Sequence, residues 1–265
     1  MIRREAYLLA GATASGKSAA AAVLAREMGA AILSADSMLV YRGMDVGTAK
    51  PDVAERAEFS MGGVDIVTPA EHFSSGAWLR AAAAWLAGLP ADRPVVIVGG
   101  TGLYFSALLR GLDRRWTNPP PEYPVLQADR AVLHARIAAR LDTMFLDGLA
   151  AEVAALRRTY PVWSDTASAA IGYKEFVEGL PPDAVRERIL IRTRQLAKRQ
   201  DTWFRHQARA LWVPIGATTE ETADRVRRVW SEKGPWTVSL QPDDASSPSS
   251  RPTENVSPGV NTVRF

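Results

Sequence analysis

Residues 11–18, which read GATASGKS, restrict the fold of this chain more than any other segment. They match the pattern G-x-x-x-x-G-K-[ST], follow an apolar run at 6–11 and precede a stretch at 18–29 that favours a helix. A strand, a glycine-rich loop and a helix in this order direct backbone N–H groups and a helix N-terminus toward an anion. The sequence therefore predicts that these residues form a phosphate-binding loop.

The loop offers candidate ligands of several kinds. Its glycines allow the backbone to wrap closely around phosphate, Lys17 adds a mobile positive charge, and the hydroxyl of Ser18 suits Mg²⁺. We therefore expect Mg²⁺ as the cofactor, with Ser18 as its protein ligand. The residues expected to contact the bound phosphates are Gly11, Ala12, Thr13, Ala14, Ser15, Gly16, Lys17 and Ser18.

Apolar strand-like runs alternate with helical stretches along the chain. Beyond the run at 6–11, strands are expected at 30–36, 64–67, 94–100, 123–128 and 210–216. Helices are expected at 73–89, with Ser74 or Ser75 as N-cap, as a pair within 129–158, and at 183–210. This alternation predicts an α/β fold of the P-loop NTPase-like type, with a doubly wound, mostly parallel sheet and flanking helices.

Two segments do not suit a compact core. Residues 117–124 read TNPPPEYP and are expected to form a connector. From Thr237 to Phe265 the chain is rich in Ser, Pro, Asp and Asn, which predicts a disordered tail. The expected organisation is one catalytic domain over 1–236 followed by a tail over 237–265.

Composition narrows the possible functions. The 265 residues include no cysteine, which excludes disulfides and thiolate metal sites and favours a cytoplasmic location. The apolar run near the N-terminus is too short for a membrane span, so we expect no membrane association. The net charge of +3 favours an anionic partner, and residues 186–209 concentrate eight Lys and Arg in one helical stretch.

An acidic residue completes the expected site. Kinases and ATPases commonly carry an aspartate after a buried strand, but the strand at 94–100 ends in Gly-Gly-Thr-Gly. Asp36 instead stands at the end of the strand at 30–36, and both strand ends should lie on the same rim as the phosphate loop. Asp36 is then either a base or a metal-shell ligand, in a Mg²⁺-assisted transfer on a phosphorylated substrate. A simple turn or cap role for Asp36 stays open.

Further stretches carry a family resemblance. They read DSMLVYRGMDVGTAKP at 36–51, GGTGLY at 99–104, IGYKE at 171–175 and TRQLAKRQDTWFR at 193–205. Together with the phosphate loop they resemble the tRNA dimethylallyltransferases over most of 6–112 and 124–212. The long first motif makes the resemblance specific.

The resemblance implies a reaction and a set of roles. Enzymes of this family transfer a dimethylallyl group from dimethylallyl diphosphate to N6 of adenine 37, next to the anticodon of tRNA, and release diphosphate. By resemblance, Asp36 accepts the N6 proton, Arg194 stabilises the diphosphate and Thr101 lines the reaction channel. The residues that the family pattern places beside the tRNA are Asp36, Ser37, Met38, Leu39 and Thr101. A monomer bound to the anticodon stem-loop is the expected assembly.

The chain also departs from the family pattern. A helical insertion that clasps the anticodon stem-loop normally follows the segment matching GLDRR, and here only the connector near 112–124 stands in its place. Three alternatives therefore stay open: prenylation of a free adenine nucleotide, a small-molecule P-loop kinase, and a non-catalytic RNA-binding protein. The GTAKP stretch and the basic helix favour tRNA as the substrate. Trp203 and Phe204 are expected in the core rather than against bases.

Overall fold

The sheet is centred on a strand that runs into the phosphate loop. The structure, a computed structural model, describes residues 2–110 and 121–240. Within them, β1 (Ile2–Gly11) lies between β3 (Val95–Gly99) and β4 (Tyr123–Gln127), and the strand order is β2-β3-β1-β4-β5. The outer strands are β2 (Ala31–Ser34) and β5 (Ala210–Pro214). All pairings in this series are parallel, as the alternation of strands and helices predicts.

A sixth strand, β6 (Trp236–Leu240), pairs antiparallel with β1. Ala6 of β1 pairs with Val95 on one edge and Trp236 on the other, and Ala10 pairs with Gly99 and Val125. β6 and β4 therefore share one edge of β1, β6 along its first half and β4 at its end. The paired sheet holds the end of β1 from both sides.

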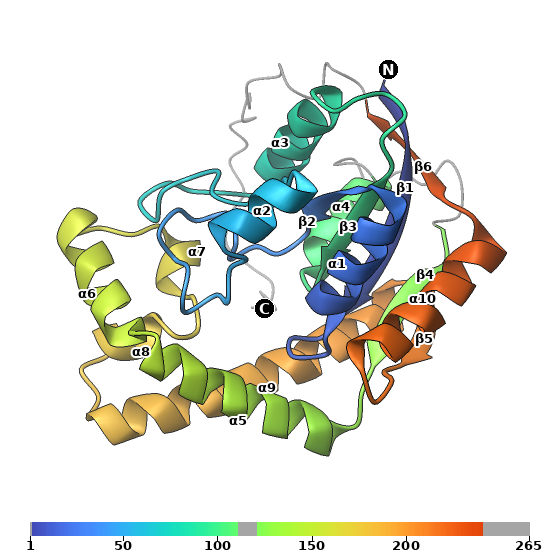
Figure 1. The fold of residues 1–265 in the computed structure, drawn as a ribbon. Helices are drawn as coiled ribbons and strands as arrows, with labels where there is room; N and C mark the ends of the chain where they lie inside the picture. Colours follow the sequence, from blue (N-terminus) through green and yellow to red (C-terminus); the bar gives the residue numbers. More distant parts are fainter. Residues whose placement is uncertain (1, 111–120, 241–265) are drawn as a thin grey trace, which may run out of the picture.

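Two helical layers cover the sheet (Figure 1). Successive residues of a strand point to opposite faces, and Leu8 and Leu9 accordingly belong to different cores. The Leu9 core lies under α1 (Lys17–Met28) and α10 (Thr219–Lys233), whose Leu24 and Trp230 fill it. The Leu8 core lies under α3 (Ser75–Ala87), α4 (Gly102–Arg110) and α9 (Pro182–Gln207). The doubly wound α/β fold is confirmed.

The remaining helices gather at one end of the sheet. In Figure 1, α5 (Arg130–Leu146) runs beside the long helix α9 below the sheet, and the two helices are in contact. The shorter helices of this part are α6 (Leu149–Thr159), α7 (Asp165–Ser168) and α8 (Lys174–Val177). A further helix, α2 (Val53–Phe59), precedes α3.

No helix within 2–110 or 121–240 is long and apolar enough to cross a membrane.

Most predicted elements are present, and Ser74 caps α3 by accepting a hydrogen bond from Ala77 N at 3.1 Å. The strand predicted at 64–67 is wrong. Among the described residues, Val67 forms only an isolated bridge, to Tyr41, because the chain turns at Asp65, whose φ is +52°. The helices α4 and α10 were not expected from the sequence.

The predicted tail boundary at 237 is also wrong. Residues 236–240 form β6, and Val238 is buried against the core. The alternation of Trp236, Val238 and Leu240 is the period-2 pattern of a strand, which the polar composition that follows obscured. Residues 241–265 and residues 111–120, which include part of the predicted connector, lie outside the described part of the chain.

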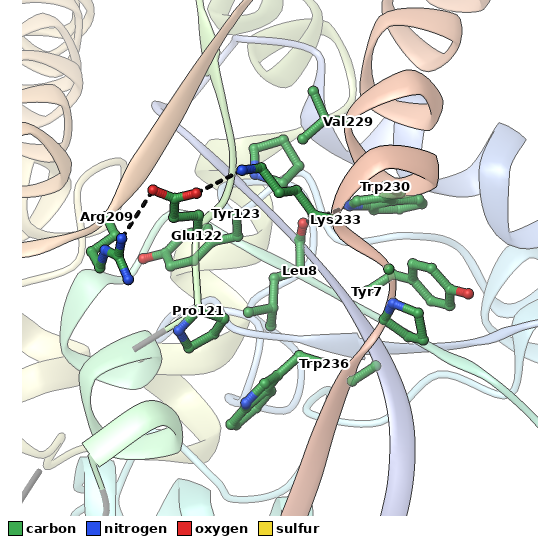
Figure 2. A pocket seen from close by; sticks show the side chains of 14 residues that line it. Tyr7, Leu8, Pro121, Glu122, Tyr123, Arg209, Val229, Trp230, Lys233 and Trp236 are labelled. Carbon is green, nitrogen blue, oxygen red and sulfur yellow. Dashed lines mark hydrogen bonds and ion pairs between the residues drawn. The ribbon is translucent and has the colours of Figure 1, made fainter. Parts of the chain in front are cut away.

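A break in the sheet edge creates a small cavity. Ala6 is the last residue of β1 that pairs with β6, and Ala10 is the first that pairs with β4. A cavity of about 300 Å³ lies at this break, and Figure 2 shows Glu122 between Arg209 and Lys233 at its rim. The aromatic residues that line it are Tyr7, Tyr123, Trp230 and Trp236. Glu122 accepts from both cations, at 3.1 and 2.8 Å, so it offsets their charge at the rim.

Removal of β6 tests the corrected boundary. A chain that ends at Pro235 loses the burial of Val238 and the β1–β6 hydrogen bonds, at a cost of about 2–3 kcal/mol. Its Tm should fall by roughly 5–10 °C relative to the full chain. A chain that ends at Leu240 keeps the strand and serves as the control. Equal melting of the two shortened chains by circular dichroism would show that β6 contributes nothing to stability.

Candidate active site

A cavity of about 680 Å³ opens at the carboxyl ends of β1, β2 and β3. The loops that follow these three strands form one side, and α5 and α9 form another. In open parallel sheets ligands bind at this rim, where neighbouring strand ends converge. The predicted meeting of the phosphate loop with the ends of the strands near Asp36 and Gly99 is confirmed, because all three segments line this cavity.

The phosphate loop has the backbone that the motif requires. Gly16 is the N-cap of α1 and has a φ of +88°, in the left-handed region that residues with a Cβ avoid. Helix α1 then begins at Lys17, whose Nζ donates to the carbonyl of Ala12 at 3.3 Å. Lys17 and Ser18 both line the cavity, so the ammonium and the hydroxyl face the same space.

Burial lowers the pKa of Lys17 to about 8, an effect that the carboxylate of Asp36 opposes and the guanidinium of Arg140 reinforces. Burial likewise lowers the pKa of Arg140, again against the influence of Asp36. The two cations and the carboxylate therefore act on one another across the cavity. A bound anion would relieve the repulsion between Lys17 and Arg140.

Asp36 lies two residues beyond β2 and lines the cavity. Its Oδ1 accepts a hydrogen bond from Met38 N at 2.9 Å, so the carboxylate shapes a turn as well as facing the cavity. Ser37 N donates to Thr101 Oγ1 at 3.0 Å, which ties this turn to the loop after β3. The five residues expected beside the acceptor all line the cavity: Asp36, Ser37, Met38, Leu39 and Thr101.

Two arginines of α5 that the sequence analysis missed reach the phosphate loop. Arg140 Nη2 donates to Thr13 Oγ1 at 2.8 Å, and Arg136 Nη1 approaches the carbonyl of Ser15 at 3.4 Å. Both line the cavity, and their i, i+4 spacing in HARIAAR places them on one side of the helix. That spacing was the available signal. The end of the cavity at the phosphate loop thus gains two cations from α5, a helix more than a hundred residues away in the sequence.

Gln200 of α9 joins two loops of the site. Its Oε1 accepts from Thr13 N at 2.8 Å, and its Nε2 donates to the carbonyl of Gly100 at 3.0 Å. This one side chain therefore couples the phosphate loop to the β3–α4 loop that carries Thr101. Gln200 was also missed, because only the tertiary fold brings its two partners together.

Arg194 of α9 directly follows Thr193, which lines the cavity. Arg194 itself does not line it. Its Nε is buried and has no hydrogen-bond partner among the described residues. Its role toward diphosphate stays a prediction.

Several basic residues of the stretch at 186–209 form ion pairs. Arg186 pairs with Asp142, Arg192 with Glu175 and Glu178, and Arg209 with Glu122. Arg205 stacks over the ring of Trp212 at 5.0 Å. The exposed residues Arg188, Lys198 and Arg199 are the other candidates on this helix for contact with nucleic acid phosphates, and Arg199 also lines the cavity.

Trp203 and Phe204 pack in the core, as expected. Phe204 is fully buried against Phe105, and the ring of Trp203 lies so close to Gly102 that a Cβ there would approach it to 2.1 Å.

Comparison with known proteins reveals related sequences and structures. The model of the family described as IPP transferase matches residues 39–124 and 117–207, and one described as Isopentenyl transferase matches 4–60. The tRNA dimethylallyltransferase of Thiobacillus denitrificans is 36% identical over 76% of this chain and 88% of its own length. That of Methylococcus capsulatus is 34% identical over 83% of this chain and 95% of its own. The crystal structure of the tRNA isopentenylpyrophosphate transferase of Bacillus halodurans matches with a TM-score of 0.75 and 25% identity, covering 87% of this chain and 98% of the other.

The matches also contain a gap. The first alignment is 276 residues long, yet only 76% of this 265-residue chain takes part in it, so the relative has residues without a counterpart here. The IPP transferase model likewise matches in two pieces that meet at 117–124. The reduced insertion at the connector stays a prediction. The similarity nevertheless spans the strands, the phosphate loop and α9, and this chain belongs to the IPP transferase family.

Proposed function

We propose that this chain transfers a dimethylallyl group from dimethylallyl diphosphate to N6 of an adenine in tRNA and releases diphosphate. One observation carries the proposal: a single cavity is lined by a phosphate-binding loop, cations and the carboxylate of Asp36. The relatives that match most of the chain are named tRNA dimethylallyltransferases. Prenylation of a free nucleotide and phosphoryl transfer to a metabolite are not favoured by these matches.

The phosphate loop and α5 would hold the donor. The amides of the loop, Lys17, Arg136 and Arg140 surround the place where the diphosphate would lie. The leaving diphosphate gains negative charge as the bond between the allylic carbon and oxygen breaks. Cations held in place beforehand stabilise that charge without reorganisation. Arg194, which the family resemblance assigns to the same task, would have to act from a position outside the cavity lining.

Asp36 would act on the acceptor. The exocyclic N6 of adenine is a weak nucleophile, and it forms the new C–N bond more readily if its proton is accepted at the same time. The Asp36 carboxylate is held by Met38 N and faces the cavity, which suits a positioned base. In this step the bond between the allylic carbon and oxygen breaks and the dimethylallyl group moves to N6. The N6 proton moves to Asp36, and diphosphate departs.

Mg²⁺ is part of the proposal as a companion of the diphosphate. The available ligand atoms suit Mg²⁺, which prefers oxygen ligands. Ser18 lines the cavity and would supply its hydroxyl, and the diphosphate oxygens would complete the coordination. Within the described residues no cluster of three or more His, Cys, Asp or Glu could hold a metal ion without the substrate. When bound, Mg²⁺ would neutralise part of the charge on the leaving group.

The finer identity of the acceptor is also proposed. An adenine inside a stacked helix cannot reach the cavity, so the base would be flipped into it, next to Ser37, Met38 and Leu39. We take adenine 37 of the anticodon stem-loop as the target, on the resemblance of the 36–51 motif. A monomer and a cytoplasmic location complete the proposal, the location because the substrate is tRNA.

Replacing the proposed base tests the reaction. The wild-type protein, given labelled dimethylallyl diphosphate, should label tRNA and leave AMP unlabelled. Asp36→Asn keeps the shape of the side chain but should lower the transfer rate by about 10²–10⁴. Binding of diphosphate to this variant, measured by calorimetry, should be retained because the loop and α5 are intact. Normal turnover by Asp36→Asn would reduce Asp36 to a turn-forming residue, and labelling of AMP alone would refute the tRNA assignment.

The arginines of α5 and α9 can be compared directly. Arg140→Gln removes a cation and its hydrogen bond to Thr13, and kcat/KM for dimethylallyl diphosphate should fall about 10²-fold. Arg186→Gln is a matched control, since Arg186 pairs with Asp142 outside the cavity lining. Arg194→Gln completes the series. A larger loss for Arg194→Gln than for Arg140→Gln would assign the diphosphate to Arg194.

The lowered pKa of Lys17 predicts a pH dependence. Below a pH of about 8 the ammonium is charged in the free protein, and above it the diphosphate must bind together with a proton. Affinity for the diphosphate should therefore weaken as the pH rises from about 7 to about 9, with proton uptake measurable by calorimetry in two buffers. Lys17→Arg stays charged throughout, so its pH dependence reports only the ionisation of the ligand. Identical profiles for wild type and Lys17→Arg would contradict a titrating Lys17.

A further inference from the structure

A half-buried carboxylate supports one wall of the cavity from the side opposite the cavity. Glu152 of α6 accepts hydrogen bonds from the amides of Asp45 and Val46 through Oε2, at 2.9 and 2.7 Å. Its Oε1 accepts from Gly47 N at 3.2 Å and from the Tyr173 hydroxyl at 2.6 Å. Successive backbone amides around one anion are the arrangement that proteins use to bind phosphate. Here the anion is a side chain of the protein itself.

Tyr173 joins this loop to a second segment. Its ring is fully buried, and a Cβ added at Gly47 would lie 2.6 Å from it, so only glycine fits at that position. Tyr173 follows the turn at 169–172, whose last amide, Gly172 N, donates to the fully buried Glu175 at 2.8 Å. The loop at 45–51 and the turn at 169–172 are thereby locked together.

Both segments line the cavity, whereas Glu152 and Tyr173 do not. The lining residues they supply are Gly47, Thr48, Ala49, Lys50, Pro51 and Ala169 to Gly172. Lys50 does not make this wall a phosphate site, because its buried ammonium pairs with Asp45 at 2.7 Å and Asp65 at 2.6 Å. The wall therefore presents backbone, mostly small side chains and the ion-paired Lys50.

The wall lies away from the donor end of the cavity. Along α9 the lining runs from Gln200, which contacts the phosphate loop, back to Ile189, about 16 Å away at 1.5 Å per residue. Arg192, one turn from Ile189, pairs with Glu175 beneath the turn at 169–172. The apolar Leu141 and Met144 line the cavity on α5 beyond Arg140, the cation that reaches the phosphate loop.

We propose that Glu152 and Tyr173 are positioning residues that hold this wall in place for the acceptor nucleotide, and not for the diphosphate. The inference rests on the proposed function, because it assumes that an adenine enters the cavity opposite the donor. Neither residue touches the substrate. They act through the loop at 45–51, whose place depends on hydrogen bonds to one carboxylate.

Two conservative variants test the proposal. Glu152→Gln presents an amide group in place of one carboxylate oxygen, so it cannot satisfy all four donors. Tyr173→Phe keeps the ring that packs on Gly47 and removes only the hydroxyl. Glu221→Gln is the matched control, since Glu221 also accepts a backbone amide, from Ala217 at 2.8 Å, but does not line or support the cavity.

The expected result separates the acceptor from the donor. In Glu152→Gln, kcat/KM for tRNA should fall about 10–100-fold, while KM for dimethylallyl diphosphate stays within about twofold of wild type. Tyr173→Phe should show a smaller fall of the same kind, and Glu221→Gln none. Hydrogen exchange of a peptide covering 45–47 should accelerate in Glu152→Gln and not in the control.

Three outcomes would overturn the inference. Faster exchange at 45–47 with an unchanged kcat/KM for tRNA would show that the wall does not position the acceptor. A parallel rise in the KM for dimethylallyl diphosphate would show a general structural role. Unchanged exchange would show that Glu152 does not hold the loop. Absence of transfer to tRNA by the wild-type protein would instead refute the proposed function, and the exchange experiment would still report on the anchor.

Discussion

The site depends on where the central strand of a parallel sheet ends. β1 is flanked by β3 on one edge and by β6 and β4 on the other, so Ala10, the residue before Gly11, is held from both sides. Helix α1 starts at Lys17 and packs its Leu24 into the core beneath the sheet. The loop between them is therefore held at both ends before any ligand binds. A loop that is held in this way would bind the proposed diphosphate at a lower cost in conformational entropy.

Helix α9 acts as the second organising element. It contacts the phosphate loop and the β3–α4 loop through Gln200, and it packs along α5, which carries Arg136 and Arg140. Near its other end Arg192 binds the buried Glu175 beneath the turn at 169–172. Arg192 thus pairs with a buried carboxylate, whereas Arg186 pairs with Asp142 of α5 at the surface. A basic stretch in a sequence does not by itself define a nucleic-acid surface, because ion pairs within the folded protein can offset its positive charge.

The cavity combines two kinds of environment. Lys17, Arg136 and Arg140 lie around the phosphate loop, where Lys17 and Arg140 repel one another without an anion. Farther along α5 and α9 the lining is apolar and is completed by the loop that Glu152 holds. The charged leaving group of dimethylallyl diphosphate matches the first environment. A flat, largely uncharged adenine base matches the second.

The sequence by itself determined the features that depend on neighbouring residues. The phosphate loop, the strand preceding Asp36, the cap at Ser74 and the length of α9 follow from local spacing, turn chemistry and periodicity. Local patterns misled at 64–67, where a turn at Asp65 interrupts an apolar run, and at 237, where a short strand precedes a polar tail. Only the tertiary structure decided the roles of Arg140, Gln200 and Glu152. Their partners Thr13, Gly100 and Val46 lie a hundred or more residues away, and no local pattern encodes a contact across that separation.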